Sequence, residues 1–301
     1  MIAGRLVLLA ALLGLTPQAQ AGQTDQQVDL PSCTLHTRTI QGPADTSGPH
    51  FLMMSGVPLS GAVFKPLGER LSARLAATST FIDFPGIGGS ALKSERHGLQ
   101  ALRTCLREYL ATQPANLFVL GDLAMPVVAP LLAETPQIRG LVVLNSVIKP
   151  SQVQPPFPLS FMRCCPSLAP AIGSLTPRAV YEMRIRDIGL GRPDSVDPEV
   201  IHALYREMRH NHGLQRLARL MNDIELDQDG DQAVLNGLAT PIPQLFLWGA
   251  ADPALGSEYR NLPELAANQQ LIVFPQGKHY LMLDHADELT DAIARWHASL
   301  P

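Results

Sequence analysis

The sequence is poor in charge and has no run of basic residues. Only 17% of its 301 residues are charged, and the formal net charge is −4 at pH 7. A surface that binds nucleic acid needs clustered Lys and Arg, so nucleic acid is not an expected partner. Hydrophobic residues make up 46% of the chain, which excludes a disordered protein. The length suits one large domain, or a core domain with an inserted cap.

Long hydrophobic runs are also missing, except at the start of the chain. Leu6 to Leu15 is an unbroken apolar block that follows Arg5 and precedes the small-x-small segment Ala19-Gln20-Ala21. Such a block is too short to cross a bilayer and is typical of a cleaved signal peptide. We therefore predict a signal peptide over 1–21 and an exported mature chain, periplasmic or secreted, without a membrane anchor. An uncleaved membrane anchor is the alternative.

Cysteine is scarce, and the sequence shows no pattern of zinc ligands. The four cysteines are Cys33, Cys105, Cys164 and Cys165. Outside the cytoplasm at least one disulfide is expected among them, but three pairings are possible and the sequence does not choose. Adjacent cysteines rarely bond each other, because their Cα atoms lie too close together. No metal and no cofactor is expected.

One acidic segment superficially resembles a calcium-binding loop. In Asp227-Gln228-Asp229-Gly230-Asp231 the glycine comes two places early, and the twelfth position would be Leu238 where a Glu is required. A solvated turn is the better interpretation.

Short apolar runs alternate with amphipathic segments along most of the chain. Residues 22–32 are polar and are predicted to form a loose lead-in, and Cys33 to Ile40 alternates like an edge strand. Buried strands are predicted at 51–54, 80–84, 117–120, 140–146, 244–248 and 271–274, and helices at 63–75, 99–110, from 126 onward and at 287–299. Strands and helices that alternate in this way predict a mostly parallel sheet with helices on both faces.

The pattern changes between Ile148 and Leu238, where strand signals are missing. Prolines crowd residues 150–177, and Thr176-Pro177 and Asp197-Pro198 each place a capping residue before a proline, which is typical of a helix start. We therefore predict a helical cap over 148–239, inserted between two core segments at 22–147 and 240–301.

The turn after the strand at 117–120 is the first candidate for chemistry. Pro126 sits early in the apolar segment that follows, which predicts strand, sharp turn and helix, the geometry of a nucleophile elbow. One register places Leu123 at the apex, which would leave no nucleophile. The other places Asp122 there, with the small Ala124 at the crowded second position, and we prefer it. Asp122 acting only as a helix cap is the alternative.

Two further residues follow buried strands. Asp252 comes just after the strand at 244–248, and His279 just after the strand at 271–274. The carboxyl ends of parallel strands share one edge of the sheet, where ligands bind. The order of Asp122, Asp252 and His279 is that of nucleophile, acid and histidine. Each residue alone would suit an ordinary loop, but the three together predict a catalytic site.

The sequence resembles the α/β-hydrolase superfamily over nearly all of its predicted mature length. The landmarks are an oxyanion loop, a glycine turn, an acid loop and a histidine segment: Ser55-Gly56-Val57-Pro58, Asp83-Phe84-Pro85-Gly86-Ile87-Gly88-Gly89-Ser90, Trp248-Gly249-Ala250-Ala251-Asp252-Pro253 and Gly277-Lys278-His279. Gly121-Asp122-Leu123-Ala124-Met125-Pro126 resembles the Asp-Trp-Gly-Gly-Pro elbow of haloalkane dehalogenases and epoxide hydrolases.

This resemblance implies a mechanism and a substrate class. Asp122 would attack a small apolar substrate, an epoxide or a carbon with an alkyl leaving group. The backbone N–H groups of Val57 and Leu123 would form the oxyanion hole, and Asp252 would orient His279, the base that activates water. A proton for an opening epoxide would come from the cap, from Tyr181, Tyr205, His210 or His212.

The sequence also departs from that pattern. The dehalogenase Trp and Asn that bind halide are replaced by Leu123 and Val57, so epoxides are expected to react better than haloalkanes. Ser55 replaces the usual His, and Asn145 stands where some relatives carry an acid, which leaves Asp252 as the only orienting carboxylate. These departures motivate the alternative function, a catalytically inactive relative that binds a small ligand or a partner under its cap.

Overall fold

The residues that the structure describes form one nine-stranded sheet. The computed structural model describes residues 23–43, 48–95, 97–114, 117–121, 124–155, 159–165, 167–168, 171 and 177–300. The strand order is β1-β2-β4-β3-β6-β7-β8-β9, with β5 paired to β2. The strands from β4 to β9 along this order run parallel, which confirms the mostly parallel sheet. In chain order, strands β1 to β9 span Gln23–Asp29, Cys33–Ile40, His50–Met54, Thr78–Ile82, Ala91–Leu92, Leu117–Gly121, Ile138–Leu144, Gln244–Gly249 and Gln269–Phe274.

The first two strands differ from the prediction. β1 pairs antiparallel with β2 along its whole length, from Gln23 opposite Ile40 to Asp29 opposite Thr34. β2 also pairs with β4, so it is an interior strand and the edge-strand prediction was wrong. The predicted loose lead-in was wrong too. The side chains of β1 are exposed along almost all of its length, so backbone hydrogen bonds to β2 hold this strand in the sheet. Its sequence has no alternation of hydrophobic and polar residues from which a strand could be predicted.

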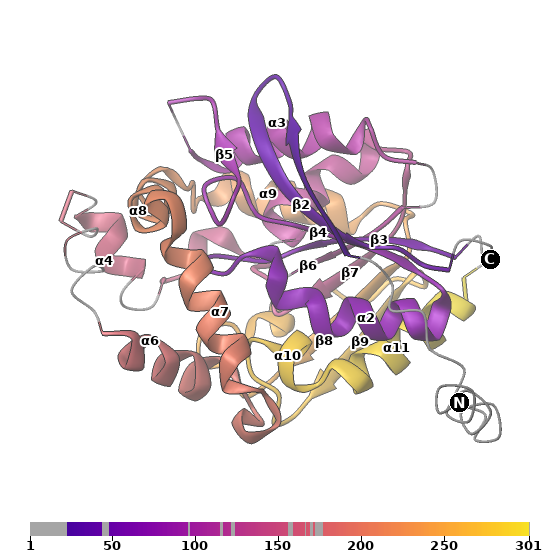
Figure 1. The fold of residues 1–301 in the computed structure, drawn as a ribbon. Coiled ribbons are helices and arrows are strands. Elements are labelled where there is room, and N and C mark those ends of the chain that lie inside the picture. Colours follow the sequence, from indigo (N-terminus) through magenta and orange to yellow (C-terminus); the bar gives the residue numbers. More distant parts are fainter. Residues whose placement is uncertain are drawn as a thin grey trace, which may run out of the picture.

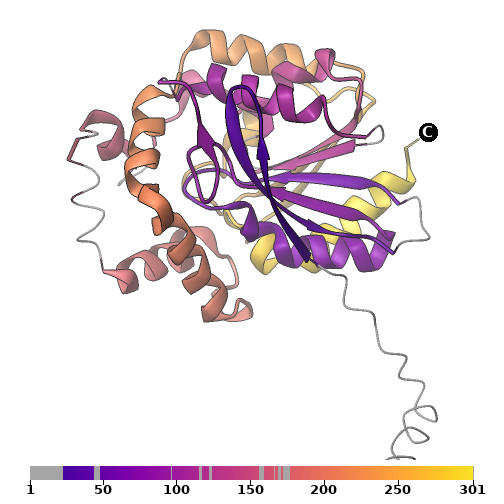
Figure 2. The ribbon, with the colours of Figure 1, turned by 45° about the horizontal axis from the view of Figure 1, so that its top comes forward.

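Hydrophobic side chains alternate between two cores, one on each face of the sheet. In β3, Leu52 and Met54 belong to one core, while Phe51 and Met53 belong to the other. Helices α3 (Leu99–Leu110) and α9 (Gln228–Leu238) cover the first face, and α2 (Lys65–Leu75) and α11 (Ala286–Ala298) cover the second (Figures 1 and 2). This buried sheet is the rigid platform for the loops at its ends.

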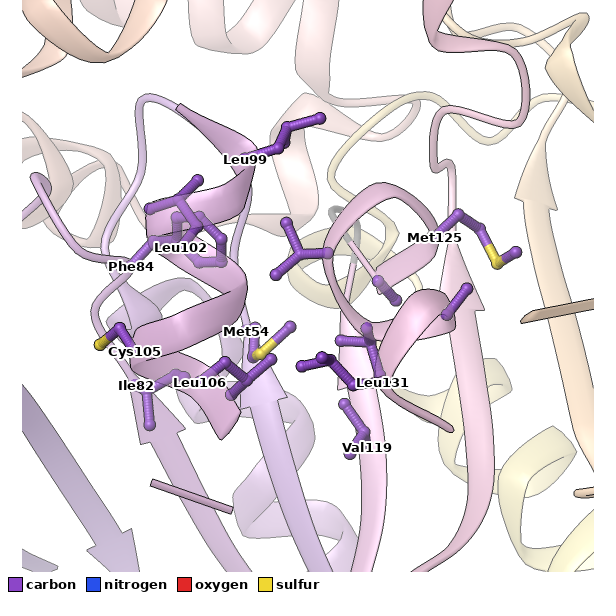
Figure 3. Packing of buried hydrophobic residues seen from close by; sticks show 14 of the residues in the cluster. Met54, Ile82, Phe84, Leu99, Leu102, Cys105, Leu106, Val119, Met125 and Leu131 are labelled. Atoms are coloured by element: carbon purple, nitrogen blue, oxygen red, sulfur yellow. The ribbon is translucent and has the colours of Figure 1, made fainter. Parts of the chain in front are cut away.

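The segment after β6 is not a regular α-helix. It forms a π-helical turn, η2 (Ala124–Val128), followed by a 3₁₀ segment, η3 (Ala129–Glu134). Pro126 lies in the first turn, where a missing N–H donor is tolerated, but Pro130 lies one turn later and removes a hydrogen bond that a regular helix needs. The segment is nevertheless buried in the same core as α3, and Figure 3 shows Leu131 beside Val119 of β6.

A disulfide joins the sheet to a covering helix. Cys33 in β2 bonds Cys105 in α3, with the two Cα atoms 5.7 Å apart, and both residues are fully buried. This confirms the expectation of at least one disulfide. Cys164 and Cys165 are not bonded to each other, in line with the geometry expected of neighbouring cysteines.

In the described part of the chain, four helices lie together beyond one end of the sheet (Figures 1 and 2). They are α4 (Leu159–Cys164), α6 (Arg178–Arg184), α7 (Pro198–Arg209) and α8 (Gly213–Asp223), and they are called the cap below. Asp197 caps α7 as predicted, its side chain accepting from the N–H of Glu199 at 2.8 Å. Pro177 is the residue before α6 and not its first residue, and Thr176 lies outside the described residues.

The calcium-like segment is the start of α9. Asp227 accepts from the N–H of Gly230 at 2.8 Å and caps this helix, so the predicted solvated turn was wrong. α9 packs against η2 and η3. Among the described residues no helix is long and apolar enough to cross a membrane.

Candidate active site

Asp252 and His279 meet at the carboxyl edge of the sheet. Asp252 follows β8 and His279 follows β9, and His279 Nδ1 lies 2.8 Å from Asp252 Oδ2. A carboxylate only accepts hydrogen bonds, so Nδ1 carries the proton and Nε2 is the basic nitrogen. The acid and the histidine predicted from the sequence are therefore brought together.

The Asp252 carboxylate is buried and strongly held. Oδ1 accepts from the N–H groups of Ala254 at 2.8 Å and Leu255 at 3.1 Å. Burial alone would raise the pKa of Asp252, but His279, Asn145 and the Ala254 N–H together lower it to about 2. The group is therefore a permanent anion at neutral pH, able to orient the imidazole and stabilise its protonated form.

Asn145 is a third member of this arrangement, and sequence reasoning missed its role. It follows β7, and its Nδ2 donates to Asp252 Oδ2 at 2.8 Å, while its Oδ1 accepts from the Gly249 N–H at 2.6 Å. Nδ2 also lies 3.3 Å from the carbonyl oxygens of Gly249 and Lys278. One buried amide thus joins the loops after three neighbouring strands. Its φ of 31° is one that Asn tolerates better than most residues.

The predicted nucleophile Asp122 and its neighbour Leu123 lie outside the described residues, but the residues on either side of them have defined contacts. At Gly121 a Cβ would meet the Met54 carbonyl oxygen at 2.4 Å, so only glycine fits there. On the other side, the Met125 N–H donates to Ser146 Oγ at 3.2 Å, and Ser146 adjoins Asn145. These contacts fix Gly121 and Met125, the described residues on either side of Asp122 and Leu123, close to the loop that carries Asn145 and Ser146.

The predicted oxyanion loop leaves β3, the neighbour of β6. Ser55, which replaces the expected His, is buried and donates through its hydroxyl to the Leu59 carbonyl at 2.6 Å. The Leu59 N–H in turn donates to the Gly56 carbonyl at 3.1 Å. The Ser55 side chain therefore stabilises the loop through a hydrogen bond within the loop. Val57 lies at the turn of this loop and is half-buried.

A buried carboxylate holds the base of this loop. Asp83, after β4, accepts from the N–H groups of Gly61 at 2.9 Å and Gly89 at 2.8 Å. Arg38 Nη1 donates to it at 2.9 Å, and His36 Nδ1 lies 2.9 Å away. Burial would raise the pKa of Asp83, but the partners outweigh this and lower it. Asp83 is therefore a buried carboxylate anion with a structural role, since it holds the backbone of Gly61 and Gly89 in place.

The two cap tyrosines form a pair. The rings of Tyr181 in α6 and Tyr205 in α7 have their centroids 5.1 Å apart. The Tyr181 hydroxyl is buried without a hydrogen-bond partner among the described residues, whereas Arg209 Nη1 donates to the Tyr205 oxygen at 3.1 Å. Burial, assisted by Tyr205, raises the pKa of Tyr181, so it stays protonated. His210 and His212 are exposed, which makes them poor candidates for a proton donor in a closed site.

The described part of the chain holds no group of three or more His, Cys, Asp or Glu side chains placed to bind a metal ion. The chemistry that the described residues offer is that of a histidine base, an orienting carboxylate and a tyrosine hydroxyl.

Comparison with solved structures identifies the fold. The Cif epoxide hydrolase from Acinetobacter nosocomialis is 16% identical with a TM-score of 0.74, covering 98% of this chain and 95% of that one. A haloalkane dehalogenase from Bradyrhizobium elkani is 20% identical, with a TM-score of 0.64 and coverage of 92% and 98%. An esterase from Exiguobacterium antarcticum is 16% identical, with a TM-score of 0.69 and coverage of 92% and 100%. No protein-family model and no curated protein sequence matches the chain.

The chain therefore has the α/β-hydrolase fold, as the sequence motifs predicted. The matched structures bear the names of different reactions, so the fold does not decide which bond is attacked. That decision rests on the side chains of the site.

Proposed function

We propose that this protein is a hydrolase that uses Asp122 to attack a saturated carbon, with an epoxide as substrate. The observation that carries the proposal is the hydrogen bond between His279 and Asp252 at the edge of the sheet where β6 ends, one residue before Asp122 in the sequence. Gly121, Asp122, Leu123 and Ala124 include no Ser, Thr or Cys, so a carboxylate is the nucleophile that this turn offers. Acyl transfer to a carboxylate would leave a reactive anhydride, whereas attack on an epoxide leaves an ordinary ester.

In the first step an Asp122 oxygen attacks one epoxide carbon, and the bond from that carbon to the ring oxygen breaks. The ring oxygen takes a proton from a cap hydroxyl, for which Tyr181 is the best candidate. Tyr181 packs against both hydrophobic cores, which lie on opposite faces of the sheet. A side chain that contacts both cores lies beyond the end of the sheet, the end at which the cap and the catalytic loops meet.

In the second step His279 Nε2 removes a proton from water, and the water oxygen attacks the ester carbonyl. Asp252 stabilises the imidazolium that forms, and Asn145 holds Asp252. The backbone N–H groups of Val57 and Leu123 would receive the negative charge on the carbonyl oxygen. Collapse of this intermediate breaks the bond from the carbonyl carbon to the substrate oxygen, which takes the proton of the added hydroxyl and leaves as the diol. Asp122 is thereby restored as a carboxylate, and the imidazolium proton returns to the tyrosinate through solvent.

The apolar side chains that the cap packs against the core support a small apolar substrate. Met162, Met208, Leu214 and Leu217 of the cap are buried in the same core as Met125. Export through a signal peptide over 1–21 is part of the proposal, supported by the apolar block and the cleavage motif; that segment lies outside the described residues.

Trapping of the ester tests the proposal. In His279→Gln the first step is intact but water is not activated, so styrene oxide should add its own mass to the protein within one turnover. The double variant with Asp122→Asn serves as the control and should gain no mass. A wild type that makes the diol while His279→Gln stays unmodified would contradict the mechanism. Absence of both diol and adduct over a panel of epoxides would favour the inactive relative.

A further inference from the structure

A cap carboxylate contacts the segment that follows the oxyanion loop. Glu207 lies on α7, and its Oε2 accepts a hydrogen bond from the Ser60 hydroxyl, although residues 60 and 207 are far apart in sequence. Ser60 is fully buried, and 30% of the Glu207 side chain is exposed. Ser60 comes two residues after Pro58, the end of the predicted oxyanion loop.

Arg38 joins this cap carboxylate to a core carboxylate. Its Nη2 lies 3.2 Å from Glu207 Oε2, and its Nη1 donates to Asp83 Oδ1 at 2.9 Å. The same Asp83 oxygen accepts the Gly61 N–H at 2.9 Å. Two consecutive residues, Ser60 and Gly61, are therefore held by two carboxylates, one from the cap and one from the core, and one guanidinium bridges them.

The arrangement makes Ser60 sensitive to the position of the cap. Ser60 and Asp83 are fully buried and only 12% of Arg38 is exposed, so solvent replaces a lost partner poorly. If α7 moves away, Ser60 loses its acceptor and Arg38 loses one of its anions. Asp25, 3.5 Å from Arg38 Nε, is 59% exposed and compensates weakly.

We propose that Glu207 is a positioning residue that couples the seating of the cap to the oxyanion loop, so that the loop is ordered only while the cap is docked. The catalytic consequence rests on the proposed function above, because it needs Val57 to serve the oxyanion. The mechanical coupling between α7 and residues 55–64 does not depend on that function.

A second cap contact keeps the test interpretable. Arg216 in α8 donates to the carbonyl oxygens of Gly88 at 2.5 Å and Ser90 at 3.1 Å. The cap therefore stays attached to the core when Glu207 is replaced. Glu199 provides the matched control, because it lies on the same helix and is 66% exposed, paired with the exposed Arg206 at 3.0 Å.

Hydrogen–deuterium exchange, which needs no substrate, measures the coupling. In Glu207→Ala, amides of residues 55–64 should exchange faster than in wild type and in Glu199→Ala. In Ser60→Ala, amides of α7 should exchange faster, because coupling between two sites is mutual. Faster exchange of residues 55–64 in Glu207→Ala, together with faster exchange of α7 in Ser60→Ala, supports the proposal. If either variant leaves the other segment at the wild-type rate, the proposal is overturned, whatever the protein catalyses.

Where an epoxide is turned over, the kinetics add a second criterion. Glu207→Ala should lower kcat about tenfold relative to Glu199→Ala, less than the loss of an oxyanion donor costs, with a smaller change in KM. The fall appears in kcat because oxyanion donors act on the transition state. An unchanged kcat in Glu207→Ala would overturn the catalytic role. A protein that turns over no epoxide fails the proposed function and leaves the exchange test to decide the coupling.

Discussion

At the scale of single residues, the site depends on one buried anion. Asp252 has its pKa lowered to about 2 by His279 and Asn145, against the opposing effect of burial. A lowered folded-state pKa stabilises the fold above the unfolded value of 3.8, and this contribution is lost as pH falls toward 2. The shift corresponds to about 2 kcal/mol of unfolding free energy at neutral pH.

We therefore expect Asp252→Asn to lower the unfolding free energy by about 2 kcal/mol at pH 7. The difference from wild type should shrink between pH 4 and pH 2, where Asp252 itself becomes protonated. Urea unfolding of both proteins at a series of pH values measures the loss in unfolding free energy at pH 7 and its decrease at lower pH. A wild-type advantage that persists undiminished at pH 2 would show that Asp252 does not carry a lowered pKa.

Asn145 is the second residue whose replacement is informative. Asn145→Asp removes the donor to Asp252 and places a second carboxyl within 2.8 Å of it in a fully buried position. We expect a loss of about 3 kcal/mol in unfolding free energy, because a buried charge would have lost its partner and gained a repulsion. The exposed Asn236→Asp is the control and should be near neutral. Equal stabilities of the two variants would contradict the joining role of Asn145.

At the scale of elements, the proposed function assigns the proton donor to the cap helix α6, through Tyr181. Tyr181→Phe keeps the ring but removes a buried hydroxyl that has no partner among the described residues. The variant should be as stable as wild type or about 1 kcal/mol more stable, since an unsatisfied group is removed. Epoxide turnover should nevertheless fall by about 100-fold, in the range of a lost general acid. Turnover equal to that of wild type would remove Tyr181 from the mechanism.

The disulfide between β2 and α3 is a second element-level feature. It spans a sequence separation of 72 residues, and a loop of this length corresponds to about 4 kcal/mol by chain entropy. The pair Cys33→Ala with Cys105→Ala should lose roughly that much unfolding free energy. Replacing Cys164 and Cys165 by Ala is the matched control and should cost little, since Cys164 is exposed and neither forms a disulfide. Similar losses in the two double variants would contradict the assignment.

The elements that sequence patterns predicted well are those with buried, alternating or periodic apolar residues. β3, β6, β7 and α3 lie close to their predicted positions. β1 was missed because a polar strand held by its backbone ladder shows no hydrophobic pattern. The helix expected from residue 126 onward is instead a π-helical and a 3₁₀ segment. Pro126 is allowed in a first turn, but Pro130, one turn later, removes a hydrogen bond that a regular helix needs.

At the scale of the whole molecule, the sheet topology explains which site residues the sequence could reveal. Asp252 follows the buried strand β8, whereas His279 follows β9, a half-buried edge strand that the sequence predicted to be buried. Parallel strands bring their carboxyl ends to one edge, so the pair was predictable. Asn145 follows β7 at the same edge, but its amide contacts depend on loop conformations that no spacing rule specifies. The Arg38 bridge from Asp83 to Glu207 joins β2, the core and the cap, and such long-range contacts leave no local signal in the sequence.

The most direct test of the central claim follows the oxygen of water. A single turnover of a small epoxide in water labelled with heavy oxygen should place the label in the Asp122 carboxylate, because water attacks the carbonyl carbon of the enzyme ester. Peptide mass spectrometry locates the label, and His279→Gln is the control that should take up none. Label found only in the diol, with Asp122→Ala still active, would contradict nucleophilic attack by Asp122.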